Sequence, residues 1–434
     1  MTWRERLYDS VIRLVVRSAS PLLRHHPRLR ERFSERYGYW NLNTDSSYIW
    51  IHGASAGELR GLVRLIPWIR RRYPDGKILI TSFSLAGITA HESEADEARL
   101  ITFDSAPWIE RALGGVQIRL FLFGEMEIWP LLISKLAQRN IPICMVNARV
   151  ETRNIQKYRR FSFLFPSLFS QISKVLVVSE SMKERFISLG VPRARVQTTG
   201  NTKYDREPLA EDDIGAIRAL CDCLPQTRII TLGSVHPGEE AWWLNQLVQR
   251  GALAGSSEQP LLVIVPRHLE KIEYFQEQLK ARGLAYECSS KIMKSPKARA
   301  SVLLVDEFGV LEKYYAVSDF AFIGGTLVAI GGHNPFEPAP YRIPIGIGPH
   351  TSKIVSEMKV LKEYDAFIEI KHESDVAGVL NQVVSQSADI TSKGDRLFQA
   401  WMSARGAVQK VEHALNELLE TPDSFLHFSR GGGQ

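Results

Sequence analysis

The chain has 434 residues, of which 44% are hydrophobic and 24% are charged. This composition excludes a disordered or fibrous chain, and the length predicts two globular domains of roughly 150–200 residues each. The formal net charge is +6, and residues 1–38 contribute +5 of it through nine arginines against four acids. The remaining chain is nearly neutral, which excludes a nucleic-acid-binding body.

The basic N-terminal segment, residues 1–40, also carries an apolar stretch from Val11 to Val16, followed by Leu22 and Leu23. Arg13 and Arg17 interrupt this stretch, so it is too short and too charged to span a bilayer or to act as a signal peptide. A basic amphipathic segment suits the surface of an anionic membrane. A first helix packed on the protein body, with solvated arginines, explains the same pattern, and the sequence leaves both interpretations open.

From residue 47 onwards, short apolar runs alternate with amphipathic stretches. Continuous apolar runs separated by helical patterns predict parallel strands buried on both faces of a sheet. The predicted strands of the first half are 48–51, 77–81, 119–123, 143–146 and 175–178. The pattern restarts with predicted strands at 228–232, 261–265, 302–305 and 320–323.

Two such series predict an α/β protein with two doubly wound, Rossmann-like domains. A polar stretch from Asp205 to Asp213 is the natural linker. We therefore expect an N-terminal acceptor domain at 41–205 and a C-terminal donor domain at 206–434, whose last helix is a candidate for packing back on the N-terminal domain.

Ligands of open α/β sheets bind at the carboxyl ends of the strands. Glu58 follows the first predicted strand and opens a helix, where free backbone N–H groups are expected to hold its carboxylate as the anion. Such a carboxylate is a candidate general base towards a hydroxyl, and Gly53 and Gly57 would let a ligand approach the backbone. An acidic residue that only complements the helix start is the competing interpretation.

Glu125 and Glu127 follow the strand at 119–123, and a simple helix start with Pro130 in its first turn is again the alternative. Lys203 precedes the linker and is either a partner for a phosphate or carboxylate or a solvated side chain. In the second half, Pro266 and Arg267 follow the strand at 261–265, where a guanidinium can bind an anion bidentately.

Three further features of the second half suit a nucleotide. Gly309 precedes a helical run, so its amides are candidates for holding a phosphate. The pairs Gly324-Gly325 and Gly331-Gly332 would allow close backbone approach. Glu337, between Pro335 and Pro338, could accept hydrogen bonds from the hydroxyls of a ribose.

Several site types find no support in the sequence. The cysteines (Cys144, Cys221, Cys223 and Cys288) form no paired CxxC motifs and read as reduced thiols. No HExxH motif or other ligand cluster indicates a metal. Neither GxGxxG nor GxxxxGK[ST] occurs, which argues against dinucleotide binding and P-loop chemistry.

Taken together, the motifs resemble the Kdo (3-deoxy-D-manno-octulosonic acid) transferase family of Gram-negative bacteria. The resemblance covers about residues 30–415. The stretches that carry it are Trp50-Ile-His-Gly-Ala-Ser-Ala-Gly-Glu58, Glu125-Met-Glu-Ile-Trp-Pro130, Val146-Asn-Ala-Arg149, Val265-Pro-Arg-His268, Gly324-Gly-Thr-Leu, Gly331-Gly-His-Asn-Pro-Phe-Glu-Pro338 and Gly348-Pro-His-Thr351.

The resemblance implies the GT-B architecture, in which two Rossmann-like domains face a cleft, and an inverting transfer of Kdo from CMP-Kdo to the phosphorylated lipid A precursor (lipid IVA) at the inner face of the cytoplasmic membrane. No metal and no other cofactor is implied. By the same resemblance, Glu58 matches the general base, and Glu125 and Lys203 match residues that stabilise the transition state. The nucleotide contacts match Pro266, Arg267, Phe308, Gly309, Val310, Asn334, Pro335, Phe336 and Glu337, while Ser55 and Gly57 are candidates on the acceptor side.

Val310 departs from the family pattern, which usually has a glutamate there. Donor binding through the backbone amides of this helix start tolerates valine, whereas binding through the glutamate side chain does not. Two other functions remain open. One is a different GT-B enzyme, such as another glycosyltransferase or a nucleotide-sugar epimerase, because fold alone does not separate them. The other is a catalytically inactive, membrane-bound lipid-binding protein, against which the intact Glu58, Glu125, Lys203 and Arg267 speak.

Overall fold

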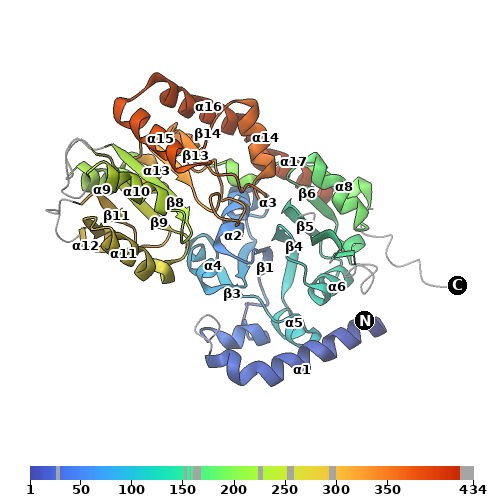
Figure 1. The fold of residues 1–434 in the computed structure, drawn as a ribbon. Coiled ribbons are helices and arrows are strands. Elements are labelled where there is room, and N and C mark those ends of the chain that lie inside the picture. Colours follow the sequence, from blue (N-terminus) through green and yellow to red (C-terminus); the bar gives the residue numbers. More distant parts are fainter. Residues whose placement is uncertain are drawn as a thin grey trace. The chain divides into compact units, whose positions relative to one another are not determined.

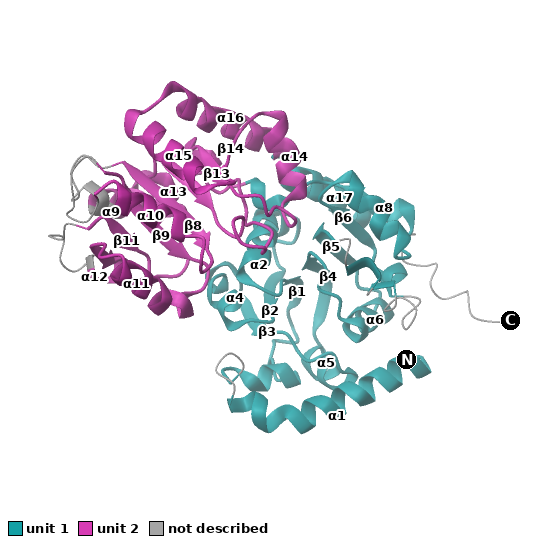
Figure 2. Ribbon diagram, viewed as in Figure 1, with its two compact units in different colours: residues 1–205, 405–434 teal, residues 206–404 magenta. Residues whose placement is uncertain are grey.

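A computed structural model of the protein describes residues 1–25, 30–150, 154–156, 158–159, 168–222, 228–251, 259–292 and 300–420. The chain divides into two compact units (Figure 2). Unit 1 comprises Met1–Asp205 and Arg405–Gln434, and unit 2 comprises Arg206–Ala404. Each unit is a parallel sheet covered by helices, so the predicted fold class, two Rossmann-like α/β domains, is confirmed.

Unit 1 is built on a seven-stranded parallel sheet with the order β3-β2-β1-β4-β5-β6-β7 (Figure 1). Its strands are β1 (Ser47–His52), β2 (Lys77–Ser82), β3 (Glu97–Leu100), β4 (Gln117–Gly124), β5 (Ile143–Ala148), β6 (Lys174–Val177) and β7 (Val196–Thr198). Its helices are α1 (Trp3–His25), α2 (Ala56–Leu62), α3 (Ile66–Arg72), α4 (Leu85–Thr89), α5 (Ala106–Ala112), α6 (Pro130–Gln138), α8 (Glu180–Ser188) and α17 (Ala407–Glu420).

Alternate residues of the unit 1 strands enter two separate cores, because successive side chains of a strand point to opposite faces. Trp50 belongs to the core that includes residues of α5 and α6. Ile49 and Ile51 belong to the other core, which includes residues of α2, α3 and α17. Helix α17 is fixed at its start by Asp205, whose carboxylate accepts the N–H of Gly406 at 2.6 Å and that of Val408.

Unit 2 repeats the plan, with the strand order β10-β11-β9-β8-β12-β13-β14, all parallel. Its strands are β8 (Ile229–Val235), β9 (Leu261–Pro266), β10 (Tyr286–Cys288), β11 (Val302–Leu304), β12 (Phe320–Ile323), β13 (Ile345–Ile347) and β14 (Ile368–Glu369). Its helices are α9 (Glu211–Asp222), α10 (Ala241–Gln249), α11 (Ile272–Ala281), α12 (Ser289–Ile292), α13 (Leu311–Ala316), α14 (Val355–Glu363), α15 (Glu373–Ser385) and α16 (Ala388–Ala404).

The N-terminal segment forms the 23-residue helix α1, which packs on unit 1 through polar side chains. The buried carboxylate of Asp9 accepts hydrogen bonds from Ser105 Oγ at 2.7 Å and from the N–H of Ala106 at 2.9 Å, where α5 begins. Glu5 accepts a hydrogen bond from Ser134 Oγ at 2.8 Å. Val16 is also buried, and Tyr8 packs against the core of unit 1. Six other large apolar residues of α1 are exposed; they are Trp3, Leu7, Val11, Leu14, Val15 and Leu22.

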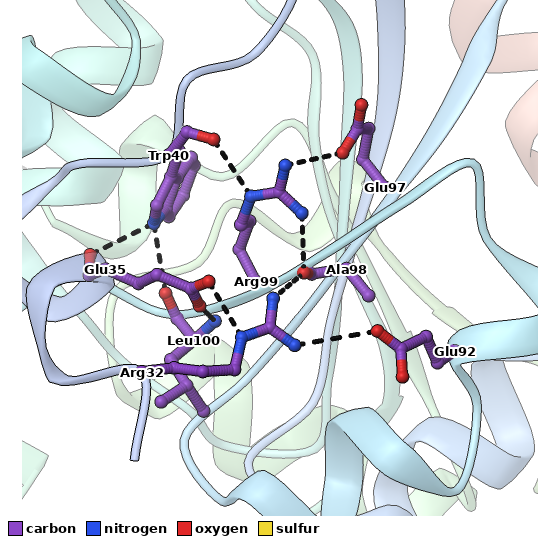
Figure 3. Close-up of polar contacts among 8 residues, drawn as sticks. All are labelled: Arg32, Glu35, Trp40, Glu92, Glu97, Ala98, Arg99 and Leu100. Carbon is purple, nitrogen blue, oxygen red and sulfur yellow. Dashed lines mark hydrogen bonds and ion pairs between the residues drawn. The ribbon is translucent and has the colours of Figure 1, made fainter. Parts of the chain in front are cut away.

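A cluster of polar contacts holds the segment after α1 against the edge strand β3 (Figure 3). Glu35 accepts the N–H of Leu100 at 2.7 Å, and Trp40 Nε1 donates to the carbonyl of Leu100 at 3.1 Å. Arg99 Nε donates to the carbonyl of Trp40 at 2.9 Å. These groups satisfy backbone atoms that an open sheet edge would leave unpaired.

The predicted strands all coincide with strands of the structure, but sequence reasoning missed β3, β7, β10, β13 and β14. Cys144 and Cys288 are buried free thiols, as predicted, whereas Cys223 and the side chain of Cys221 lie outside the described residues. Arg28, one of the nine arginines of residues 1–38, also lies outside the described residues.

Both sheets have the strand order of doubly wound folds, in which successive strands are first added on one side of the starting strand and then, from a switch point, on the other side. The switch point lies between β1 and β4 in unit 1 and between β8 and β12 in unit 2. The loops after these strands are therefore the expected places for a site in each unit.

Candidate active site

Glu58 lies in the first turn of α2, after β1, at the switch point of unit 1. Its Oε2 accepts the N–H of Ala54 at 3.1 Å. Burial, followed by the charges of Glu125 and Glu127, raises the pKa of Glu58 from 4.5 to about 7. Desolvation and the two neighbouring carboxylates outweigh the hydrogen bond from the Ala54 N–H, so Glu58 is held as the anion less strongly than its place at a helix start predicts. A carboxyl group with a pKa near 7 is well matched to general-base catalysis at neutral pH.

Glu125 follows β4 in a left-handed backbone conformation, with φ of 54°, which is strained for a residue other than glycine. Its Oε1 accepts a hydrogen bond from Lys203 Nζ at 2.7 Å. Arg149 binds the same carboxylate through two nitrogens, each at 3.0 Å. Burial alone would raise the pKa of Glu125, but Lys203 and Arg149 lower it below its ordinary value. Glu125 is thus an ionised carboxylate with two cationic partners.

Lys203 is positioned by a buried network around Thr202. Asn147, at the end of β5, accepts the N–H of Thr202 at 2.9 Å and donates to its hydroxyl at 2.8 Å. That hydroxyl donates to the carbonyl of Gly61 in α2 at 2.8 Å. A Cβ at Gly61 would lie 2.7 Å from the Asn147 amide nitrogen, so only glycine admits this close packing. The network joins the helix of Glu58 to the turn of Lys203.

The acceptor-side candidates lie next to Glu58. Ser55 precedes α2, and its exposed side chain makes no capping hydrogen bond. A Cβ built on Gly57 would meet only Ser55 Oγ, at 3.9 Å, so the space there is open. Gly53 differs from the prediction, because a Cβ there would lie 3.0 Å from the backbone nitrogen of Leu59. Gly53 serves the chain's own tight turn, whereas Gly57 leaves room for a ligand.

The predicted donor residues lie at the end of β9 and on segments that follow β9, β11 and β12 in unit 2. Pro266 ends β9, and Arg267 follows it with an exposed side chain, while its N–H donates to the carbonyl of Val235 at 2.9 Å. Phe308 is 67% exposed and stands before Gly309, whose φ is 83°. Val310 is partly buried against the core beside α13.

The stretch from Asn334 to Glu337 follows β12 as a tight turn. Asn334 Oδ1 accepts the N–H of Phe336 at 3.1 Å, and the Phe336 ring is buried. The carbonyl of Glu337 accepts a hydrogen bond from Arg206. The charge of Glu337 also acts on Tyr315, whose pKa is raised well above 10, first by burial and then by Glu337. The hydrogen bond from Arg206 therefore fixes the backbone of Glu337, which lies between Pro335 and Pro338.

The glycine turn after β12 does not offer its amides to a ligand. The buried carboxylate of Glu239 accepts the N–H groups of Gly325 at 2.7 Å, Thr326 at 2.9 Å and Leu327 at 2.9 Å. It also accepts the N–H of His236, at 2.9 Å. Glu239 thus occupies these amides and ties the turn to the loop after β8. Close approach of a nucleotide to the Gly324-Gly325 backbone stays a prediction.

The structure thus brings Glu58, Glu125 and Lys203 together in unit 1 and gathers the predicted donor residues at one edge of the unit 2 sheet. Sequence reasoning assigned no role to Arg149, Asn147 or Glu239. The position of Asn147 and Arg149 at the carboxyl end of β5, the strand adjacent to β4, was a usable signal. Within the described residues, no group of three or more His, Cys, Asp or Glu side chains could hold a metal ion.

Comparison with known proteins agrees with these features. The sequence profile of the 3-deoxy-D-manno-octulosonic-acid transferase family matches residues 31–206. A 3-deoxy-D-manno-octulosonic acid transferase of Haemophilus influenzae is 30% identical over 401 residues, which cover 91% of this chain and 93% of that protein. One from Rickettsia felis is 27% identical and covers 88% of this chain and 80% of its own length.

Among solved structures, a UDP-GlcNAc 2-epimerase from Neisseria meningitidis has a TM-score of 0.57 at 12% identity and covers 86% of this chain and 100% of its own. This likeness shows the two-domain fold alone. The identity to the Haemophilus influenzae enzyme over nearly the whole length shows the family. The chain belongs to the Kdo transferase family of glycosyltransferases.

Proposed function

We propose that the protein is an inverting glycosyltransferase that moves Kdo from CMP-Kdo to the phosphorylated lipid A precursor. The observation that carries the proposal is Glu58, a partly buried carboxyl group with a pKa of about 7 beside the ionised Glu125. Loss of a proton gives Glu58 the basicity that a hydroxyl acceptor requires. Membership of the Kdo transferase family supplies the identity of donor and acceptor.

In this reaction the acceptor hydroxyl oxygen attacks the anomeric carbon of Kdo, and its proton passes to Glu58. The bond from that carbon to the phosphate oxygen breaks on the opposite side, and its electron pair leaves with CMP. A single displacement of this kind inverts the anomeric centre. Lys203 and Arg149 hold Glu125 in place, so the charges near the reacting carbon are fixed before the transition state forms.

Unit 2 is proposed to bind the donor. The exposed Arg267 would pair with the phosphate, and Glu337 would accept hydrogen bonds from the ribose hydroxyls. Phe308, Gly309 and Val310 would contact the nucleotide through the backbone, because the Val310 side chain packs towards the core. We propose that Arg267, rather than a metal ion, supplies the positive charge for the leaving group.

We further propose that α1 attaches the enzyme to the anionic cytoplasmic face of the inner membrane. The exposed apolar residues of α1 recur every three or four positions, as on a helix lying in the headgroup boundary. The second half of α1 contributes Arg17 and Arg24 to the lining of a cavity of about 600 Å³, which Arg30 and Arg111 also line. Basic side chains of this kind attract lipid phosphates. Within the described residues, no helix is long and apolar enough to cross a bilayer.

A nucleotide screen tests the proposed function against another enzyme of the same fold. CMP should raise the unfolding temperature of the purified protein, whereas UDP should not. Protection by UDP alone would favour a nucleotide-sugar enzyme of the epimerase kind. Protection by neither nucleotide would favour a catalytically inactive lipid-binding protein.

A further inference from the structure

Three histidines from three different loops meet at the switch point of unit 2. His236 follows β8, His268 follows β9 and His333 follows β12. The rings of His236 and His333 stack with centroids 5.2 Å apart and an interplanar angle of 9°. The ring of His268 meets that of His236 edge-on, with centroids 5.6 Å apart. Neither the motifs nor the proposed mechanism assigns these side chains a role.

The two stacked histidines share one hydrogen bond. Nε2 of His236 lies 2.9 Å from Nε2 of His333. A neutral imidazole has one N–H and one lone pair, so one of the two nitrogens donates to the other. A proton added at the accepting Nε2 would place an N–H on both Nε2 atoms, break the contact and leave two donors for another acceptor.

Positive charges surround the pair. Burial, followed by Arg267, lowers the pKa of His333 to about 3, and His236, Lys353 and His268 act in the same direction. Burial, followed by His268, Arg267 and Lys353, also lowers the pKa of His236. The acidic neighbours do not offset this. Glu239 is bound by four backbone N–H groups, and Glu270 lies 4.0 Å from His268.

A site with this charge favours an anion. An incoming phosphate would offset the positive charges of Arg267 and Lys353, and its own negative charge would attract a proton to the accepting Nε2 of the histidine pair. Glu239 holds the geometry, because it joins the N–H of His236 to the glycine turn that leads to His333. The charge of Arg267, already proposed as the phosphate partner, lowers the pKa of both His236 and His333.

We propose that His236 and His333 form the phosphate subsite of the donor domain and take up one proton from solvent when the phosphate enters. This proposal rests on the proposed function. As the bond between the anomeric carbon and the phosphate oxygen breaks, the two imidazole N–H groups donate to the oxygen that gains the electron pair. The pair returns its proton to solvent when CMP leaves, so the proton of the acceptor hydroxyl remains with Glu58.

Calorimetry with CMP and with cytidine tests the proposal, because the two ligands differ only by the phosphate. Titrations at pH 7.5 in two buffers of different ionisation enthalpy give the number of protons bound. For the wild-type protein we expect CMP to bind with net proton uptake and cytidine to bind with none. Part of the free CMP carries a protonated phosphate and would release that proton if CMP binds as the dianion. This release has the opposite sign to the expected proton uptake.

The His236→Asn and His333→Asn variants should lose the proton uptake and bind CMP about 10- to 100-fold more weakly, as expected when a charge-assisted hydrogen bond is lost. Their affinity for cytidine should be unchanged, which also shows that they fold. His413→Asn, at an exposed histidine of α17, is the matched control and should behave as the wild type.

Two results would overturn the proposal. The first is binding of CMP to the wild-type protein without proton uptake, a measurement that requires no variant. The other is a variant that binds cytidine and retains wild-type affinity for CMP. A wild-type protein that binds neither ligand would instead contradict the proposed function.

Discussion

Glu58→Gln should abolish sugar transfer and yet stabilise the folded protein at alkaline pH. A carboxyl group whose pKa rises from 4.5 to about 7 on folding favours its protonated form in the folded state by about 3 kcal/mol, at roughly 1.4 kcal/mol per pKa unit. This stability is fully present below pH 4.5 and is lost as the pH rises through about 7. Glutamine imitates the protonated form at every pH.

Urea unfolding at pH 4.5 and pH 8, followed by tryptophan fluorescence, measures the effect. The free energy of unfolding of Glu58→Gln should exceed that of the wild type by up to about 3 kcal/mol at pH 8, and by little at pH 4.5. Transfer activity should fall on the order of 10²–10⁴-fold. Glu31→Gln, at an exposed position, should change neither quantity. A variant that is less stable than the wild type at pH 8, or that retains half of its turnover, would refute this reasoning.

Four further outcomes are expected. The pH profile of kcat/KM should rise to a plateau with an apparent pKa of about 7, and Glu127→Gln should move that rise to lower pH, because the Glu127 charge raises the pKa of Glu58; an unmoved profile would contradict the assignment. Arg267→Ala and Glu337→Ala should each weaken CMP binding by about 1.5–3 kcal/mol in calorimetry, and unchanged affinity in both would place the nucleotide elsewhere. Activity should persist in excess chelator; a loss that a divalent metal restores would refute the metal-free proposal. Leu14→Asp with Leu22→Asp should release the protein from anionic vesicles, and added salt should weaken binding of the wild type, whereas continued flotation of the variant would refute attachment through α1.

The sequence was informative wherever strands are buried on both faces. Runs such as Leu261–Val265 are continuously apolar, and all such runs proved to be strands. β3 was missed because it alternates Glu97 and Arg99 with apolar residues at a sheet edge. β7, β10, β13 and β14 were also missed, and each has only two or three residues. Short or edge strands carry too few buried side chains to give a pattern.

The sequence predicted which residues lie at the site, but not which side chains bind one another there. The rule that ligands bind at strand ends identified Glu58, Glu125 and Arg267 as candidates. It could not show that Glu125 is bound by Lys203, which is 78 residues away along the chain. Nor could it show that Glu239 occupies the amides of the glycine turn. Such pairings depend on which loops tertiary packing brings together, and local sequence does not record them.

The most direct test of the account is product analysis with the purified protein. Incubation with CMP-Kdo and lipid A precursor, followed by mass spectrometry, should show a lipid product heavier by at least one Kdo residue, with release of CMP. The same incubation with Glu58→Gln should leave the precursor unmodified. A wild-type protein that leaves the precursor unchanged with CMP-Kdo, yet transfers a sugar from a UDP-linked donor, would contradict the proposed function.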